Sequence, residues 1–234
     1  MEHVIEFKDV TKKYEMGEGE LLAVDSISFT VDEGEFVVIL GPSGAGKSTL
    51  LNLLGGMDVA TEGNIWIDEK DITELELDEL SVYRAEDVGF VFQFYNLIPT
   101  LTVYENVALI KEIASDCLDV EETLNSVGLG AHLHKFPTQL SGGEQQRVSI
   151  ARAICKNPKM LLCDEPTGAL DSQTGVKILS LLQKMSREHG RTVIIVTHNS
   201  NLAEAADKVI YLKNGKINDI VINKTPKDVS EVEW

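Results

Sequence analysis

Cysteines, which could cross-link a fold or bind a metal, are scarce in this chain. Its 234 residues contain three, an odd number without the paired spacing of a disulfide framework or a zinc site. A chain of this length can bury about 70–75% of its unfolded surface, so it needs no such cross-link. Cys163 lies in an apolar run and is predicted to be a small buried hydrophobe. A reducing, intracellular setting fits this cysteine content.

Long apolar runs and basic residues are also lacking. No run approaches the ~20 apolar residues of a membrane-spanning helix, and residues 1–6 lack the basic and apolar regions of a signal peptide. Lys and Arg number 21 against 38 Asp and Glu, a formal net charge of −17. This balance argues against nucleic acid as a partner and against adsorption to anionic lipid. We therefore expect no direct membrane insertion, and any membrane role to depend on a protein partner.

What the chain does contain is a glycine-rich segment, residues 41–49, between an apolar run at 36–40 and a leucine-rich segment at 50–54. Strand, glycine loop and helix in this order are the context in which G-x-x-x-x-G-K-[ST] cradles phosphate. Glycines let backbone N–H groups face an anion, and the helix N-terminus adds about half a positive charge. The segment therefore predicts a nucleoside triphosphate site rather than an ordinary glycine turn. Its candidate binding residues are Gly41, Ser43, Gly44, Ala45, Gly46, Lys47, Ser48 and Thr49.

Two side chains of this segment have specific expected roles. Lys47 should reach the outer phosphates as a point charge, and the Ser48 hydroxyl should bind Mg²⁺. We therefore expect ATP or a similar nucleotide, with Mg²⁺, as the bound species.

Three further apolar segments, 88–92, 160–163 and 192–196, are predicted strands. The last two are separated by residues 174–185, whose apolar residues have helical spacing. Apolar strands separated by helices indicate a parallel sheet covered on both faces. The predicted fold class is therefore α/β.

The remaining segments predict smaller features around this sheet. Segments 4–10 and 24–31 alternate and are expected to pair as an N-terminal antiparallel β-subdomain, with a polar loop from Met16 to Glu20 between them. Residues 64–68 are expected to form an edge strand and 73–84 a surface helix. The remaining two predictions are a type I′ hairpin through Asn214-Gly215 and a loosely held acidic tail from Thr225.

The pattern becomes helical and polar from about residue 94 to residue 157, with breaks at Pro99 and Pro137. We expect a helical subdomain at 94–157 inserted into a catalytic core formed by 1–93 and 158–234. Together they make up one domain, 1–234.

Asp164 and Glu165 end the predicted strand 160–163. Ligands of α/β proteins lie outside the carboxyl ends of the strands, where Asp164 could hold Mg²⁺ and Glu165 could orient or deprotonate an attacking water. Two acids at a strand end often form only a solvated turn, but the phosphate loop upstream favours the functional interpretation.

His198 and Gln93 occupy equivalent positions after two other strands. The His198 N–H could stabilise charge near the γ-phosphate, although a lone histidine is more often structural. Gln93 could reach Mg²⁺ and the water through its amide. His132 and His134 lack further ligands and are expected to be surface histidines.

A second glycine motif spans residues 140–147, Leu-Ser-Gly-Gly-Glu-Gln-Gln-Arg. Ser141 is a suitable N-cap, and Gly142 and Gly143 leave backbone N–H groups open at the start of an amphipathic helix. This pattern fits a second anion site for a γ-phosphate in the same chain or another. A capped helix without a ligand explains the residues equally well.

Taken together, these motifs resemble those of the ATP-binding subunits of ABC transporters, over essentially the whole chain. The matching motifs are Walker A (Gly41–Thr49), the Q-loop (Gln93), the signature (Leu140–Glu144), Walker B with the catalytic glutamate (Met160–Asp164 and Glu165), the D-loop (Ala169–Asp171) and the switch histidine (His198). Six motifs in this order make chance agreement negligible. Glu144 departs from the usual Gln of the signature, which leaves the role of this side chain open.

The resemblance implies a P-loop NTPase core and a head-to-tail homodimer, with each ATP held between the Walker A motif of one chain and the signature of the other. It implies that Tyr14 stacks on adenine, where plain strand packing is the alternative, and that Asp171 belongs to the nucleotide site. It also implies an integral membrane permease as partner and a peripheral location on the cytoplasmic face of the membrane.

Segments 90–99 and 165–171 resemble the lipoprotein-releasing and macrolide-exporter branch of the family, although the insert at 106–141 looks shorter than in many members. Residues 94–102 are expected to line the groove for a coupling helix of the permease. The expected function is a Mg²⁺-dependent ATPase powering export of peptides, lipoproteins or drugs. One alternative is an ATPase of a cell-envelope or cell-division complex that transports nothing. A soluble ABC ATPase acting on nucleic acid is disfavoured by the single motif set and the acidic charge.

Overall fold

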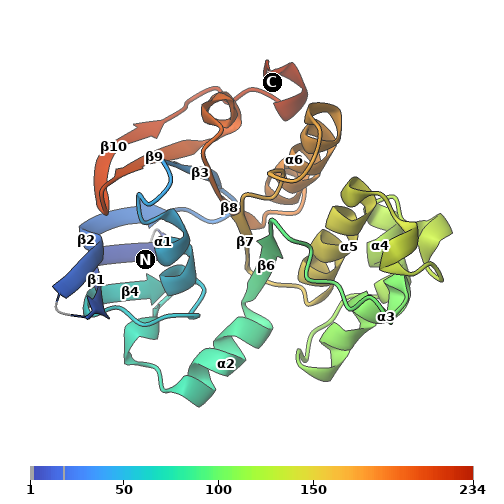
Figure 1. Ribbon diagram of the computed structural model, residues 1–234, viewed down its shortest axis with the longest axis horizontal. Coiled ribbons are helices and arrows are strands. Elements are labelled where there is room, and N and C mark those ends of the chain that lie inside the picture. Colours follow the sequence, from blue (N-terminus) through green and yellow to red (C-terminus); the bar gives the residue numbers. More distant parts are fainter. Residues whose placement is uncertain (1–2, 18, 234) are drawn as a thin grey trace.

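Two sheets form the framework of the protein in the computed structural model, which describes residues 3–17 and 19–233. The first sheet is antiparallel, in the order β2-β1-β4-β5, and lies on the left in Figure 1. Its strands are β1 (Ile5–Met16), β2 (Gly19–Val31), β4 (Glu62–Ile67) and β5 (Lys70–Asp71). The predicted N-terminal antiparallel pairing is confirmed.

The second sheet has the order β10-β9-β3-β8-β7-β6. Its strands are β3 (Phe36–Leu40), β6 (Val88–Phe92), β7 (Met160–Asp164), β8 (Thr192–Thr197), β9 (Lys208–Lys213) and β10 (Lys216–Ile222). All neighbours are parallel except β9 and β10, which form the predicted hairpin. Asn214 and Gly215 both have positive φ, 50° and 77°, as a type I′ turn requires.

Alternation along the parallel strands divides the core between the two faces of this sheet. In β3, Val37 and Ile39 face a cluster shared with the first sheet and α1 (Lys47–Leu54), whereas Val38 joins a cluster with α5 (Gly142–Cys155) and α6 (Ser172–Arg187). α1 therefore lies between the two sheets, and α5 and α6 cover the opposite face (Figure 1). This is the predicted α/β class with a parallel sheet covered on both faces.

Segment 94–157 has a hydrophobic core of its own and lies on the right in Figure 1. It contains α3 (Val103–Ala108), η2 (Leu109–Glu112), α4 (Val120–Ser126), η3 (Gly130–His132), η4 (Pro137–Gln139) and α5. Val148 and Ala151 of α5 face this core, while Ile150 and Ala153 face the parallel sheet. α5 therefore packs against both the core of segment 94–157 and the parallel sheet.

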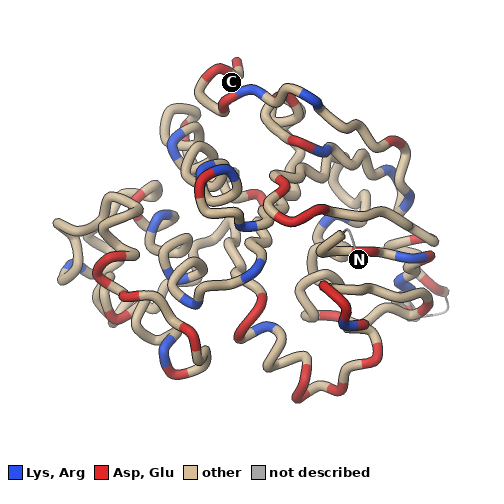
Figure 2. Tube along the Cα trace, turned by 180° about the vertical axis from the view of Figure 1, so that it is seen from behind, with Lys and Arg blue, Asp and Glu red and all other residues tan. Residues whose placement is uncertain are grey.

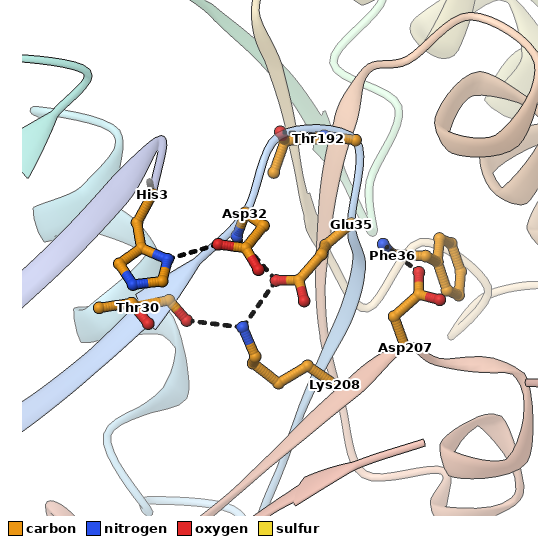
Figure 3. Close-up of polar contacts among 9 residues, drawn as sticks. His3, Thr30, Asp32, Glu35, Phe36, Thr192, Asp207 and Lys208 are labelled. Carbon is orange, nitrogen blue, oxygen red and sulfur yellow. Dashed lines mark hydrogen bonds and ion pairs between the residues drawn. The ribbon is translucent and has the colours of Figure 1, made fainter. Parts of the chain in front are cut away.

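A polar cluster around the buried Lys208 side chain links the first sheet to the second (Figure 3). Lys208 on β9 donates to the backbone carbonyl of Thr30 on β2 at 2.9 Å and to Glu35 Oε2 at 2.7 Å. Glu35 Oε2 also accepts from the Asp32 N–H at 2.8 Å, and His3 contacts the Asp32 carboxylate. The Lys208 side chain is only 7% exposed. Removal of either charge would therefore leave its partner buried and unpaired, which is costly.

Three local predictions are corrected. The strand at 64–68 is not an edge strand, because β5 covers its outer side. The helix expected at 73–84 is preceded by the short turn η1 (Ile72–Glu74) and begins only at Leu77, as α2 (Leu77–Glu86). The tail from Thr225 is docked: η6 (Val229–Glu231) contacts α6, and Val229 and Val232 are buried. Of the predicted loop and tail, Glu18 and Trp234 lie outside the described residues.

Acidic residues are spread over many elements, including the region of α2 at the bottom of Figure 2, with basic residues scattered among them. The large negative charge is therefore distributed over the surface. Within residues 3–17 and 19–233, no helix has both the length and the apolar character needed to cross a bilayer.

Candidate nucleotide-binding and catalytic site

A cavity of about 960 Å³ lies at the carboxyl ends of β3, β6, β7 and β8. The predicted site residues that line it are Tyr14, Ser43, Gly44, Gly46, Lys47, Ser48, Thr49, Gln93, Asp164, Glu165 and His198. Segments separated by more than 180 residues in the chain thus meet at one edge of the parallel sheet, as the strand-end rule requires.

The phosphate loop is held between β2 and the β9–β10 hairpin. A Cβ on Gly46, which has φ +100°, would lie 2.3 Å from the Ala23 carbonyl oxygen, so only glycine fits this position. The Gly215 N–H donates to the Ala45 carbonyl at 3.0 Å. No described side chain caps the start of α1. The first N–H groups of α1 have no partner within the helix, and the residues that carry them, Lys47, Ser48 and Thr49, line the cavity.

Lys47 spans the phosphate loop. Its Nζ donates to the carbonyls of Gly41 at 2.8 Å and Pro42 at 3.1 Å, and the residue is 9% exposed. The ammonium is thereby kept inside the curve of the loop. This position is where a phosphate held by the loop would meet it.

Gly41 and Ala45 do not line the cavity. A Cβ on Gly41 would lie 2.5 Å from the Leu212 carbonyl oxygen, and Ala45 is 2% exposed. Gly41 and Ala45 instead contact the β9–β10 hairpin, outside the cavity lining.

The predicted Mg²⁺ ligands lie together in the cavity. The Ser48 hydroxyl donates to Asp164 Oδ1 at 3.4 Å, and Gln93 lines the same wall. Burial raises the pKa of the Asp164 carboxyl, and the nearby Glu165 acts in the same direction. Hydroxyl, carboxylate and amide oxygens are the donors that Mg²⁺ prefers, so this set fits the ion.

Glu165 is held by hydrogen bonds at both carboxylate oxygens. Thr197 Oγ1 donates to its Oε2 at 2.9 Å, and His198 Nδ1 lies 2.9 Å from its Oε1. The backbone of Glu165 has φ +46°, and its N–H donates to the Val196 carbonyl at 3.0 Å. The left-handed backbone is a strained conformation of the kind found at functional sites. The His198 side chain is 74% exposed, so it remains accessible from the cavity.

Tyr14 forms part of the outer wall of the cavity. Its hydroxyl donates to Asp58 Oδ2 at 2.6 Å, and the Lys12 ammonium lies 5.0 Å from the ring centroid. Burial raises the pKa of Tyr14. Leu21 and Leu22 line the same cavity and are exposed there, so an apolar surface adjoins the aromatic ring.

Besides Gly41 and Ala45, four predicted nucleotide-site residues do not line this cavity: Ser141, Gly142, Gly143 and Asp171. Ser141 caps α5, and its hydroxyl accepts from the Glu144 N–H at 3.4 Å. Asp171 caps α6 by accepting from the Thr174 N–H at 3.0 Å. The signature residue Ser141 and the D-loop residue Asp171 thus cap helices outside the cavity that contains the phosphate loop of the same chain.

Sequence reasoning missed Gln146, which is fully buried. Its Nε2 donates to the carbonyls of Phe92 at 3.2 Å and Pro166 at 2.8 Å. These carbonyls immediately precede Gln93 and follow Glu165, so one amide ties the signature helix to both walls of the cavity. The available signal was a glutamine on the apolar face of an otherwise amphipathic helix.

Further residues that the sequence did not single out line the cavity: Leu21, Leu22, Ala23 and Asn214. Local sequence could not assign them, because β2 and the β9–β10 hairpin reach the phosphate loop only in the folded chain.

Comparisons with known proteins identify this arrangement. The family model described as ABC transporter matches residues 24–168. The uncharacterised ABC transporter ATP-binding protein MJ0796 of Methanocaldococcus jannaschii is 46% identical over 228 residues, covering 92% of this chain and 95% of that protein. The macrolide export ATP-binding/permease protein MacB of Rhodopirellula baltica is 42% identical over 92% of this chain. The present chain spans only 32% of that MacB protein.

Solved structures agree with the sequence relatives. A dimeric structure of MJ0796, described as a bacterial ABC transporter cassette, matches with a TM-score of 0.86 at 44% identity over 94% of this chain and 99% of that one. A dimeric post-hydrolysis state of the same cassette, bound to ADP and Pi, matches with a TM-score of 0.85 over the same shares. The predicted fold, the ATP-binding and ATP-hydrolysing character and the similarity to macrolide exporters are confirmed. The chain belongs to the ABC transporter family and is an ATP-binding cassette that hydrolyses ATP.

Proposed function

We propose that this cassette is a Mg²⁺-dependent ATPase that works as a pair and powers export through a membrane permease. The observation that carries this proposal is the convergence of the phosphate loop, Asp164, Glu165 and His198 on one cavity. In this arrangement the loop N–H groups and Lys47 bind the β- and γ-phosphates. Positioning and electrostatic stabilisation of this kind account for most of the catalysis of phosphoryl transfer.

Glu165 is the proposed base or orienter of the attacking water. Its two oxygens are fixed by Thr197 and His198, so the carboxylate faces the cavity in a defined orientation. On this proposal both ring nitrogens of His198 carry a proton when ATP is bound, so that Nδ1 donates to Glu165 and Nε2 donates to the γ-phosphate.

Mg²⁺ would be held by Ser48, Asp164 and Gln93, whose donor atoms fit it. When bound, the ion neutralises part of the phosphate charge. The Ser48 hydroxyl and the Asp164 carboxylate already face each other, so little rearrangement of these side chains is needed.

A head-to-tail pair would complete the site. Ser141, Gly142 and Gly143 lie outside the cavity of their own chain, yet they form a capped helix start suited to an anion. The dimeric MJ0796 structures support pairing of such cassettes. On this proposal each γ-phosphate lies between the phosphate loop of one copy and the signature of the other, with Asp171 beside the contact.

The permease is the proposed membrane partner and would place the cassette at the cytoplasmic face of the membrane. MacB relatives carry ATP-binding and permease functions in one longer protein, of which this chain matches about a third. Phe94, directly after Gln93, and Ile98, five residues after it, are 72% and 41% exposed and offer an apolar contact for a permease segment. On this view 94–157 is a helical subdomain inserted into a catalytic core of 1–93 and 158–234. The exported class would be peptides, lipoproteins or drugs.

Glu165→Gln tests the catalytic assignment. The variant should bind ATP normally but hydrolyse it about 10²–10⁴-fold more slowly, since the amide cannot take a proton, and should accumulate as an ATP-bound dimer. Phosphate release and sedimentation velocity measure the two effects. Glu121→Gln, on the exposed face of α4, makes the same charge change as a control. Turnover near that of the control would show that Glu165 is neither the base nor the residue that orients the attacking water.

Co-purification tests the proposed partner. The tagged cassette isolated from detergent-solubilised native membranes should retain an integral membrane protein, and Phe94→Asp should release it while ATP hydrolysis by the free cassette persists. If this variant retained the membrane protein, Phe94 would not be part of the contact with the permease.

A further inference from the structure

The signature loop contains an acidic side chain that the proposed function does not use. Glu144 Oε2 accepts hydrogen bonds from both the backbone N–H and the hydroxyl of Ser141, each at 2.7 Å. A serine hydroxyl has one proton to donate. In this state of the subunit, the Ser141 proton is therefore already engaged by a carboxylate and is not free for a phosphate.

This carboxylate remains charged. The hydrogen bonds from Ser141 hold the pKa of the Glu144 carboxyl below its usual range. Hydrogen bonds to an ionised acceptor are roughly twice as strong as neutral ones. Glu144 therefore holds the Ser141 hydroxyl more firmly than a glutamine at the same position would.

His132 faces the other oxygen of the same carboxylate. Its Nε2 lies 3.5 Å from Glu144 Oε1, and both side chains are partly buried, at 22% and 23% exposed. His132 comes from η3 and is therefore less exposed than the surface position predicted for it, whereas His134 is exposed as predicted. Arg147, on the same helix as Glu144, also lowers the pKa of its carboxyl.

The ring of His132 has a defined proton position. Among the described residues, its Nδ1 is buried and has no hydrogen-bond partner. A proton on Nδ1 would be a buried donor without an acceptor, which is more costly than an unpaired acceptor nitrogen facing apolar surroundings. The proton is therefore assigned to Nε2, the ring nitrogen 3.5 Å from Glu144 Oε1.

From this geometry we propose that Glu144 and His132 are positioning residues that set how readily the signature accepts a partner's ATP. The inference rests on the proposed composite site. As the two subunits close, the Ser141 O–H must turn from Glu144 Oε2 to the γ-phosphate, and the Glu144 charge opposes the approaching triphosphate. His132 weakens both effects, because its N–H draws the carboxylate charge toward Oε1 and away from Ser141.

The test uses Glu165→Gln as a background in which ATP-bound dimers accumulate. Glu144→Gln should tighten this dimer by about fivefold or more at each site, since the amide oxygen keeps the cap but holds the hydroxyl less strongly. His132→Leu, which has no N–H to place beside the carboxylate, should weaken the dimer by roughly two- to fivefold when Glu144 is present. In the Glu144→Gln background, His132→Leu should have no further effect.

The measurement is the protein concentration at half-dimerisation at fixed Mg-ATP, by sedimentation velocity. ADP affinity by calorimetry should stay constant in every variant, which separates the signature from the phosphate loop. His134→Leu is the matched control, because His134 is exposed and forms no ion pair with any described residue. Equal thermal midpoints of the variants show that the cap of α5 is intact.

Two outcomes overturn the inference alone: a dimer unchanged or weakened by Glu144→Gln, or an effect of His132→Leu that is the same in both backgrounds. A complete lack of ATP-dependent dimers is a different result. It overturns the composite site of the proposed function, and this inference with it.

Discussion

Two helices of this cassette begin at glycine motifs, and their first turns differ in one respect. α1 starts at Gly46, which has a left-handed backbone and offers no side-chain cap, and its start lines the large cavity. α5 starts at Ser141, whose side chain and backbone are closed into a capping box with Glu144. Both starts carry the partial positive charge of a helix N-terminus, but only the first is open toward an anion within its own chain.

The difference shows how similar physics can serve two purposes. An uncapped helix start has N–H groups that need a partner, so the phosphate loop is built for a resident ligand. A capped start is satisfied by itself and stable without a ligand. A capped start therefore suits a surface that is solvent-exposed in one state and in contact with a phosphate in another.

Among substitutions at the two helix starts, Ser141→Arg should cause the largest loss of ATP turnover. A long cation in place of the cap would block approach of a second copy, and we expect ATP turnover to fall at least about 100-fold, the loss typical when a group that stabilises the transition state is removed. Nucleotide affinity of the single subunit should remain unchanged, since Ser141 does not line the cavity. Steady-state phosphate release and calorimetry measure the two. An active variant would show that the start of α5 is not part of a composite site.

Lys47→Ala should act on the other helix start alone. Loss of the ammonium removes charge-assisted contacts to the phosphates, each worth about 1.5–3 kcal/mol, so ATP affinity should fall roughly 10–100-fold. The same substitution also frees the Gly41 and Pro42 carbonyls. Lys177→Ala on exposed α6 surface provides a lysine-deletion control. Calorimetry with ATP that gave equal affinities would contradict the assignment of Lys47.

Alanine substitutions at Gly46 and Gly142 should differ in their effect on thermal stability. A Cβ at Gly46 meets the Ala23 carbonyl oxygen at 2.3 Å and requires a left-handed backbone, which costs about 1–2 kcal/mol before any clash. At Gly142 it meets the hydroxyl end of the Tyr95 side chain at 2.8 Å, which can move. Thermal unfolding should therefore show a clear loss for Gly46→Ala and little change for Gly142→Ala. The reverse order would mean that α5, not α1, has the more constrained start.

Tyr14→Ala should give the smallest effect. Base–aromatic stacking is worth about 1–3 kcal/mol, so ATP affinity should fall roughly 5–100-fold, toward the lower figure because Leu21 and Leu22 remain. Tyr14→Phe, which loses only the hydrogen bond to Asp58, should retain most of the affinity. If alanine and phenylalanine weaken binding equally, Tyr14 contributes through Asp58 and not through its ring.

The elements that sequence predicted well are those that depend on neighbouring residues. The phosphate loop, the Asn214-Gly215 turn and the acids after β7 each have a local signal in the chain. The cavity contacts of Leu21 and the clamp made by Gln146 have none, because their partners are distant in sequence. The docked tail was missed for a related reason: Val229 and Val232 stand alone among acidic residues, and only the surface of α6 shows where they are buried.

The Gln146 amide has a consequence for how the two ends of one subunit communicate. α5 cannot slide along the sheet without lengthening its hydrogen bonds to the carbonyls of Phe92 or Pro166, each worth about 0.5–1.5 kcal/mol. Movement of the signature helix relative to the residues next to Gln93 and Glu165 therefore costs these two hydrogen bonds. On the proposed head-to-tail pairing, this connection would couple a shift at one cavity to the nucleotide in the other.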